Sequence, residues 1–121
     1  MTTQIRLIYH LCREDEWRAA EAIGAYLGSS QDRDDGFIHF STADQVVESA
    51  ARHRAGQPGL VLIAAEAEAL GSALKWETSR HGHLFPHLYG PLPVTAVRWT
   101  RPLPLGANGA HVFPPLDEET S

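Results

Sequence analysis

Two short segments of the chain combine aromatic residues with polar side chains capable of chemistry. The first is Gly36-Phe37-Ile38-His39-Phe40-Ser41-Thr42, and the second is Phe85-Pro86-His87-Leu88-Tyr89-Gly90-Pro91-Leu92. His39, His87 and Tyr89 can each exchange a proton or a hydrogen bond, and an aromatic ring can stack on a flat ligand. The two prolines of the second segment remove backbone donors and predict a rigid element at a sheet edge. Both segments are candidates to line a ligand pocket, with a rigid structural corner as the alternative for the second.

The first segment is a predicted strand whose alternate positions face opposite ways. Phe37, His39 and Ser41 share one face, and Ile38 and Phe40 share the other. If the second pair faces the core, His39 and Ser41 point together toward a cleft or solvent. The alternative is that His39 is a half-buried strand histidine without a ligand.

A predicted helix begins directly after this strand. Thr42 followed by Gln45 matches a capping box, and Ser41 precedes them. The amides of a helix N-terminus form an anion site, which beside His39 suits a phosphorylated or dinucleotide ligand. The alternative is that Ser41 and Thr42 only cap the helix.

His10 and Glu77 complete the candidate catalytic residues. His10 lies at the end of the first predicted strand, and it faces the same cleft as His39 if the two strands lie near each other. Glu77 lies on another predicted strand, where a carboxylate can orient a ribose hydroxyl or act as a base. The alternatives are an exposed strand-end histidine for His10 and a simple ion pair for Glu77.

Metal and thiol chemistry receive less support. His81, His83 and His87 are close in sequence, but their spacing matches no zinc signature and no cysteine pair accompanies them, so no metal is expected. Cys12 is the only cysteine, and it shares a strand face with His10. A catalytic thiol needs a lowered pKa and a base in contact, so a buried structural thiol is the favoured interpretation.

The pattern of apolar residues predicts an α+β fold, or a mixed β fold with two helices. The predicted strands are 5–11, 36–41, 60–65, 74–77 and the end of 93–101, with an extended element at 85–90. The predicted helices are 13–27 and about 42–54, and residues 31–35 are a polar connection. The apolar positions expected to face inward on the helices are Trp17, Ala20, Ile23 (or Gly24), Leu27, Val46, Val47, Ala50 and Ala51.

Length and composition limit the classes of function. The chain has 121 residues, enough for one compact domain, and a net charge of −5 with scattered Lys and Arg, which disfavours nucleic acid as a partner. A local cationic pocket for one phosphorylated ligand remains open. We expect a cytoplasmic protein without a membrane partner. The chain has a single cysteine and no apolar N-terminal stretch, and its longest apolar run, residues 59–65, is too short to span a membrane. Oligomeric state is left open.

Four blocks of sequence resemble a known family. They are Tyr9-His10-Leu11, segment 36–42 with Gln45-Val46, Lys75-Trp76-Glu77, and segment 85–92. In this order and spacing they are similar to the family catalogued as domain of unknown function 952, which comprises small proteins of bacteria and plants. The resemblance covers about residues 5–101, which predicts a single domain over 1–101. Residues 102–121, rich in proline and glycine, are predicted to form an extended arm with a frayed end.

The resemblance also implies a fold and a site. The family's fold resembles that of ADP-ribosyltransferases, a split mixed or antiparallel β-sheet with two main helices around a cleft that holds NAD in the enzymes. By this likeness His10 matches the first-strand residue that contacts the nicotinamide ribose. His39 and Ser41-Thr42 match the second-strand motif, and Tyr89 is placed to stack on nicotinamide.

The resemblance leaves two residues for the third, catalytic position. Glu77 is the nearest carboxylate and His87 is the alternative, because the familiar glutamate motif is absent. The variant without that glutamate resembles the tRNA 2′-phosphotransferase branch, which uses NAD to remove an RNA phosphate. That branch is more basic than this chain, so an RNA substrate is less attractive here.

Three hypotheses of function result. The first is an ADP-ribosyltransferase-like enzyme that uses NAD as its substrate, with His10 and His39 holding the ribose and a carboxylate, Glu77, stabilising a cationic transition state. The second is a binding module for a nucleotide or another small polar ligand, with the same pocket, including His87 and Tyr89, and no turnover. The third is a structural or interaction protein in which the histidines only satisfy the fold.

Overall fold

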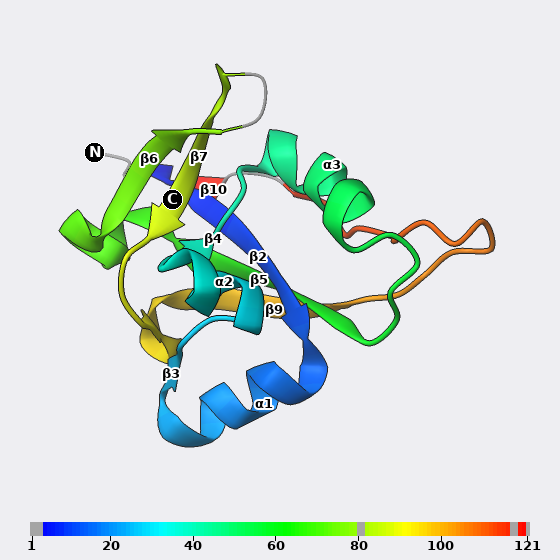
Figure 1. Cartoon of the computed structure of the whole chain (residues 1–121), viewed down its shortest axis with the longest axis horizontal. Coiled ribbons are helices and arrows are strands. Elements are labelled where there is room, and N and C mark those ends of the chain that lie inside the picture. Colours follow the sequence, from blue (N-terminus) through cyan, green and yellow to red (C-terminus); the bar gives the residue numbers. More distant parts are fainter. Residues whose placement is uncertain (1–3, 80–81, 117–118, 121) are drawn as a thin grey trace.

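The computed structural model describes residues 4–79, 82–116 and 119–120 (Figure 1). His81 of the histidine-rich loop and residues 117, 118 and 121 of the C-terminal arm lie outside the described residues. The helices are α1 (Glu14–Ile23), α2 (Ser30–Asp35) and α3 (Ala43–His53), with short 3-10 turns at Ala67–Ala73 and Val94–Ala96. The strands are β1 (Gln4–Ile5), β2 (Leu7–Arg13), β3 (Ala25–Tyr26), β4 (Ile38–His39), β5 (Leu60–Glu66), β6 (Leu74–Thr78), β7 (Leu84–Leu88), β8 (Leu92–Pro93), β9 (Val97–Leu103) and β10 (Glu119–Thr120).

The central sheet is antiparallel, in the order β2-β5-β9. Its middle strand, β5, carries the apolar run expected to be a buried strand, and residues 60–65 are all buried. A strand with neighbours on both edges and cover on both faces needs apolar side chains at every position rather than alternating ones. The prediction of a strand at 60–65 is therefore confirmed.

A second antiparallel sheet has the order β4-β7-β6, and an isolated bridge between Tyr9 and Ser41 links it to the first. Tyr9 of β2 and Ser41 exchange two backbone hydrogen bonds of 2.8 Å, and the amide of Phe40 donates to the carbonyl of Pro86 at 3.0 Å. The chain around residues 39–41 therefore joins two three-stranded sheets. The α+β class is confirmed, with antiparallel sheets and few helices.

The two longer helices cover opposite faces of β2 (Figure 1). Leu7, Tyr9 and Leu11 of β2 form one apolar cluster with Val46 and Ala50 of α3. Ile8 and Cys12, on the other face of β2, belong to a second cluster that includes Trp17 and Ala20 of α1. Alternate residues of β2 thus face opposite sides, and both of its faces are buried.

Three details of the predicted helices are wrong. The first helix ends at Ile23 because Gly24 adopts a left-handed conformation (φ 85°), and the chain then enters β3. Ile23 and Leu27 are consequently 71% and 52% exposed instead of facing inward, and Tyr26 is buried in their place. In α3, Val46 and Ala50 are buried as expected, but Val47 and Ala51 are exposed because they lie on the outer side of the helix.

The polar connection expected at residues 31–35 is also wrong, because these residues form α2. Its start is a capping box in which the Asp32 amide donates to Ser29 Oγ at 3.2 Å and the Ser29 amide donates to Asp32 Oδ2 at 2.8 Å. The following strand is shorter than expected, since only Ile38–His39 belongs to β4.

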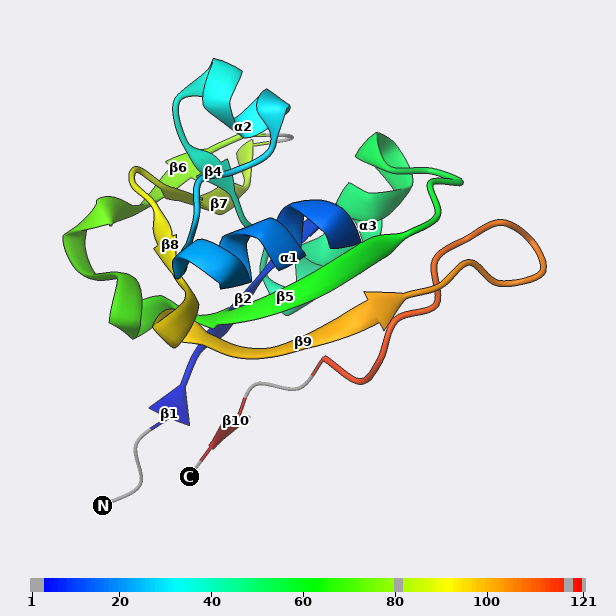
Figure 2. The same cartoon turned by 90° about the horizontal axis from the view of Figure 1, so that it is seen from below.

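The C-terminal segment packs back against the domain (Figure 2). After β9 the chain turns, and His111 Nε2 donates to the carbonyl of Gln57 at 2.9 Å. Phe113 and Leu116 then pack on the apolar cluster that lies beneath α3, and β10 pairs with β1. The domain boundary proposed at residue 101 stays a prediction.

Two glycines flank α2, and only one of them is crowded. Gly28 and Gly36 both have positive φ (97° and 87°), but a Cβ on Gly28 would lie 2.8 Å from Asp32 Cβ, whereas one on Gly36 would meet nothing within 4 Å. We predict that Gly36→Ala lowers the free energy of unfolding by about 1 kcal/mol through backbone strain. Gly28→Ala should cost about 1–3 kcal/mol more because it also displaces Asp32. Urea denaturation of both variants checks this, and equal losses would contradict it.

Candidate functional site

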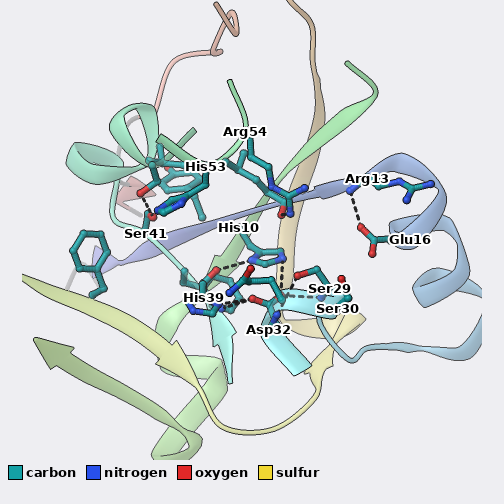
Figure 3. Close-up of a pocket in the computed structure, with 17 residues that line it drawn as sticks. His10, Arg13, Glu16, Ser29, Ser30, Asp32, His39, Ser41, His53 and Arg54 are labelled. Carbon is teal, nitrogen blue, oxygen red and sulfur yellow. Dashed lines mark hydrogen bonds and ion pairs between the residues drawn. The ribbon is translucent and has the colours of Figure 1, made fainter. Parts of the chain in front are cut away.

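A pocket of about 450 Å³ opens at the junction of the two sheets (Figure 3). Its walls come from β2, the start of α1, the start of α2, residues 39–41, the inner side of α3 and Phe85 of β7. Three of the residues predicted from sequence line it, namely His10, His39 and Ser41. The structure therefore brings the two strand histidines to one cavity, as expected.

His10 forms the floor of this pocket and is almost fully buried, with 4% of its surface exposed. Its Nδ1 lies 2.6 Å from the carbonyl oxygen of His39, which can only accept, so Nδ1 carries the proton. Its Nε2 then accepts from the Tyr26 hydroxyl at 2.8 Å. Burial lowers the pKa of His10 below its ordinary value, and a neutral ring with a fixed tautomer results.

Asp32 of α2 is the buried carboxylate of the site, with 3% of its surface exposed. Its Oδ1 accepts from His39 Nδ1 at 2.5 Å and from the His39 amide at 3.2 Å, while Oδ2 accepts from the Ser29 amide at 2.8 Å. Burial alone raises the pKa of a carboxyl group, but these hydrogen bonds outweigh it and hold the pKa of Asp32 well below its ordinary range. Asp32 is thus an anion.

His39 lies between two carboxylates of α2. Besides Asp32 at Nδ1, its Nε2 lies 3.0 Å from Asp35 Oδ2. The hydrogen bond to Asp32 raises the pKa of His39 against the opposing effect of partial burial, and Asp35 adds to it. The surroundings of His39 therefore favour its protonated ring, whereas those of His10 favour the neutral ring. The imidazolium ties α2 to β4.

This ion pair predicts a dependence of stability on pH. A raised His39 pKa gives stability that is complete below the unfolded value of about 6.5 and is lost as pH rises through the folded value. A depressed Asp32 pKa gives stability that is lost below about pH 4. We predict that His39→Gln lowers the free energy of unfolding by about 1–2 kcal/mol near pH 6, after allowance for partial exposure. The deficit should shrink toward pH 9 or so.

The check is chemical denaturation across this pH range. His83→Gln, the same substitution at an exposed histidine, serves as the control and should change stability by no more than about 0.5 kcal/mol. A deficit of constant size between acidic and alkaline pH would contradict the ion pair.

Tyr26 is the only described hydrogen-bond partner of His10 Nε2. Burial raises the pKa of the Tyr26 hydroxyl, which therefore stays protonated as the donor. We predict that Tyr26→Phe destabilises the protein by about 1–3 kcal/mol, because it leaves a buried acceptor without a donor. Tyr89→Phe also removes a hydroxyl hydrogen bond, but at an exposed position where water replaces it, and should cost clearly less than Tyr26→Phe. Thermal unfolding of the two variants tests the contrast, which equal losses would refute.

Three other predicted residues, Glu77, His87 and Tyr89, form a second group outside the lining of this pocket. Glu77 Oε1 accepts from the Tyr89 hydroxyl at 2.7 Å and from His87 Nδ1 at 2.9 Å. The hydrogen bond from Tyr89, followed by that from His87, lowers the pKa of Glu77, and the same contact raises the pKa of Tyr89. Phe37 stacks on His87 with ring centroids 4.1 Å apart.

This second group is connected to the pocket through His39. His39 and His87 are paired residues of β4 and β7, and their ring centroids are 5.7 Å apart. Phe37 also contacts His39, with centroids 4.6 Å apart. The two predicted segments therefore do meet, but Glu77, His87 and Tyr89 lie beside the pocket rather than in its wall. Their roles as catalytic or ligand-binding residues stay predictions.

Ser41 and Thr42 have different positions despite being neighbours. The Ser41 hydroxyl lies 3.0 Å from that of Ser49 in α3 and lines the pocket. Thr42 begins α3, and its amide donates to Gln45 Oε1 at 3.0 Å, so the expected capping box is confirmed. Thr42 lines a separate hollow with Arg6 and Trp76.

Sequence reasoning missed several lining residues. Asp32 was not selected, although Ser29 followed three residues later by an acidic residue is a recognisable helix-start pattern. Ser49 lies on the inner side of α3, and Arg54 follows its last residue. No sequence motif at either position indicates a ligand. Cys12 is buried, and burial raises the pKa of its thiol to about 12, so the interpretation as a structural thiol agrees with its surroundings.

These observations define a class of protein, a small α+β domain with a polar pocket where two antiparallel sheets meet. The chain belongs to the family described as Protein of unknown function (DUF952), whose sequence model matches residues 11–100. The resemblance found in the sequence blocks is thereby confirmed.

Experimental structures of a related protein share the fold. A crystal structure of protein CC0527 from Caulobacter crescentus is 50% identical and has a TM-score of 0.85, covering 88% of this chain and 93% of that one. A solution NMR structure of CC0527 is 51% identical with a TM-score of 0.77, covering 86% and 90%. A search of curated proteins finds no match. Among the described residues, no helix has the length and apolar character needed to cross a membrane.

Proposed function

We propose that the pocket at the sheet junction binds NAD or a related nucleotide, and that the chain acts as a small-molecule-binding module. The observation that carries the proposal is that His10, His39 and Ser41, from two separate segments of the sequence, line one cavity of about 450 Å³. Pockets for small ligands commonly have volumes of this order, about 300–1,000 Å³, with a few convergent polar groups.

The chemistry of the lining fits part of a nucleotide. Ser41 and Ser49 present hydroxyl groups suited to ribose oxygens, and Phe40 and Phe85 supply aromatic surface. The cavity is also lined by Arg54, whose permanent positive charge favours an anionic over a cationic ligand. With Asp32 compensated by His39, the pocket has no unpaired buried carboxylate facing such a ligand.

A second candidate is an ADP-ribosyltransferase-like or 2′-phosphotransferase-like enzyme acting on the same ligand. In ADP-ribosyl transfer, the bond between the nicotinamide nitrogen and ribose C1′ breaks, and an acceptor bonds to C1′ and releases a proton. The favouring observation is that the Glu77–His87 pair fixes an imidazole next to the ring of His39. Binding takes precedence because Glu77, proposed for the catalytic position, is bonded to His87 and Tyr89 beside the pocket.

The test is thermal unfolding with and without millimolar NAD. A ligand at about a hundred times its dissociation constant adds roughly 2.7 kcal/mol to stability, which raises the midpoint by several degrees. We predict this shift for the wild type and for His83→Gln, and a smaller shift for His39→Gln, because position 39 lines the pocket and position 83 does not.

The absence of a shift in the wild type would remove the basis of the nucleotide proposal. Chromatography of the same incubations separates the two candidates. Intact NAD supports the binding module, and released nicotinamide supports the transferase.

A further inference from the structure

Arg54, the residue that follows α3, has no acidic partner among the residues that the structure describes. Its guanidinium makes two long hydrogen bonds to neutral acceptors, 3.3 Å to Gln57 Oε1 and 3.4 Å to the carbonyl of Leu11. Charge-assisted hydrogen bonds of arginine to an anion are shorter, about 2.7–2.9 Å, and stronger. Arg54 therefore keeps capacity to bind an anion.

The other charges of the pocket already have partners. Asp32 accepts from His39, and Glu16 Oε1 accepts from the Arg13 amide at 3.1 Å. Arg13 itself pairs with Asp15 at 2.7 Å. Glu16 has the neutral Arg13 amide as its donor, so among these groups Arg54 is the cation without an anionic partner. The charge of Arg54 reaches His10, whose pKa it lowers in addition to the larger effect of burial.

A purely structural role explains part of this arrangement. A cation at the C-terminal end of a helix is favourable to the helix dipole, and Arg54 occupies that position in α3. That role needs only the charge near the helix end. It does not require the side chain to extend into the pocket above His10, where Figure 3 shows it between His53 and Arg13.

We infer that Arg54 binds a phosphate group of the pocket's ligand, so that the ligand class is phosphorylated nucleotides rather than nucleosides. This inference rests on the proposed function, and it names Arg54 as the residue that selects phosphorylated nucleotides over nucleosides. The planar guanidinium can replace its two long contacts with a bidentate pair to phosphate oxygens. His10 is neutral and bonded at both ring nitrogens, so it supplies no competing cation at the floor.

The experiment measures binding of pyrophosphate, NAD and adenosine by calorimetry to the wild type, Arg54→Gln and Arg52→Gln. Arg52 lies on the same helix, is exposed and pairs with Glu48 outside the pocket, so its variant controls for net charge. Losing a charged hydrogen bond costs about 1.5–3 kcal/mol. This corresponds to pyrophosphate binding roughly 10- to 100-fold weaker in Arg54→Gln, with a change below about twofold in Arg52→Gln. Adenosine affinity should not depend on position 54.

The outcomes distinguish the inference from the proposed function. Wild-type binding of NAD with unchanged affinities in Arg54→Gln overturns the Arg54 inference and leaves the nucleotide site in place. Pyrophosphate binding that depends on Arg54, without NAD binding, supports the anion site and removes the nucleotide proposal. No pyrophosphate binding by the wild type overturns the inference.

A readout on the wild type guards against a variant that does not fold. The Arg54 side-chain Nε–H signal in NMR spectra should shift during a pyrophosphate titration, and an unshifted signal at saturation overturns the inference.

Discussion

The buried carboxylate of Asp32 is the group on which the arrangement of the site depends. It accepts hydrogen bonds from the ring and the amide of His39 and from the amide of Ser29. An ionised carboxylate is stable away from water only with such partners, so the chain around Asp32 is held in one conformation. The contacts join α2 to β4, and they fix the wall of the pocket and the ring of His39 at once.

A chain of hydrogen bonds extends from this carboxylate into the core. Asp32 holds His39, the His39 carbonyl accepts from His10, and His10 accepts from Tyr26. These four residues belong to α2, β4, β2 and β3, which are far apart in the sequence. The junction of the two sheets is therefore closed by a polar network as well as by apolar packing. The pocket lies beside the isolated Tyr9–Ser41 bridge, which links β2 to the chain that follows β4.

Sequence patterns predict the parts of this structure that repeat over several residues. The alternation in β2, the apolar run of β5 and the inward face of α3 at Val46 and Ala50 follow from period and hydrophobicity. The meeting of His10 and His39 follows from the placement of two strands. The non-periodic α2 was missed because its six residues are too few to show a helical period, and the Ser29–Asp32 capping box is the main local sign of its start.

The division of the site into a pocket and an adjoining group could not be predicted from the sequence either. Glu77 meets His87 because β6 and β7 pair locally, and this pairing is independent of where α2 lies. His39 contacts α2, whose start forms part of the cavity wall, whereas Glu77 and Tyr89 lie outside that wall. A single sequence carries no signal for that distance.

Residue 39 contributes through two chemically independent parts. Its imidazole binds Asp32, but the atom that fixes the tautomer of His10 is its backbone carbonyl oxygen. Every amino acid supplies that oxygen, so side-chain replacement at this position deletes only one of the two contributions. Alanine scanning will consequently understate what the position does. The contribution of the carbonyl is reached through the backbone, for example by an ester in place of the amide that follows residue 39, which weakens the acceptor and also removes the Phe40 N–H donor to Pro86.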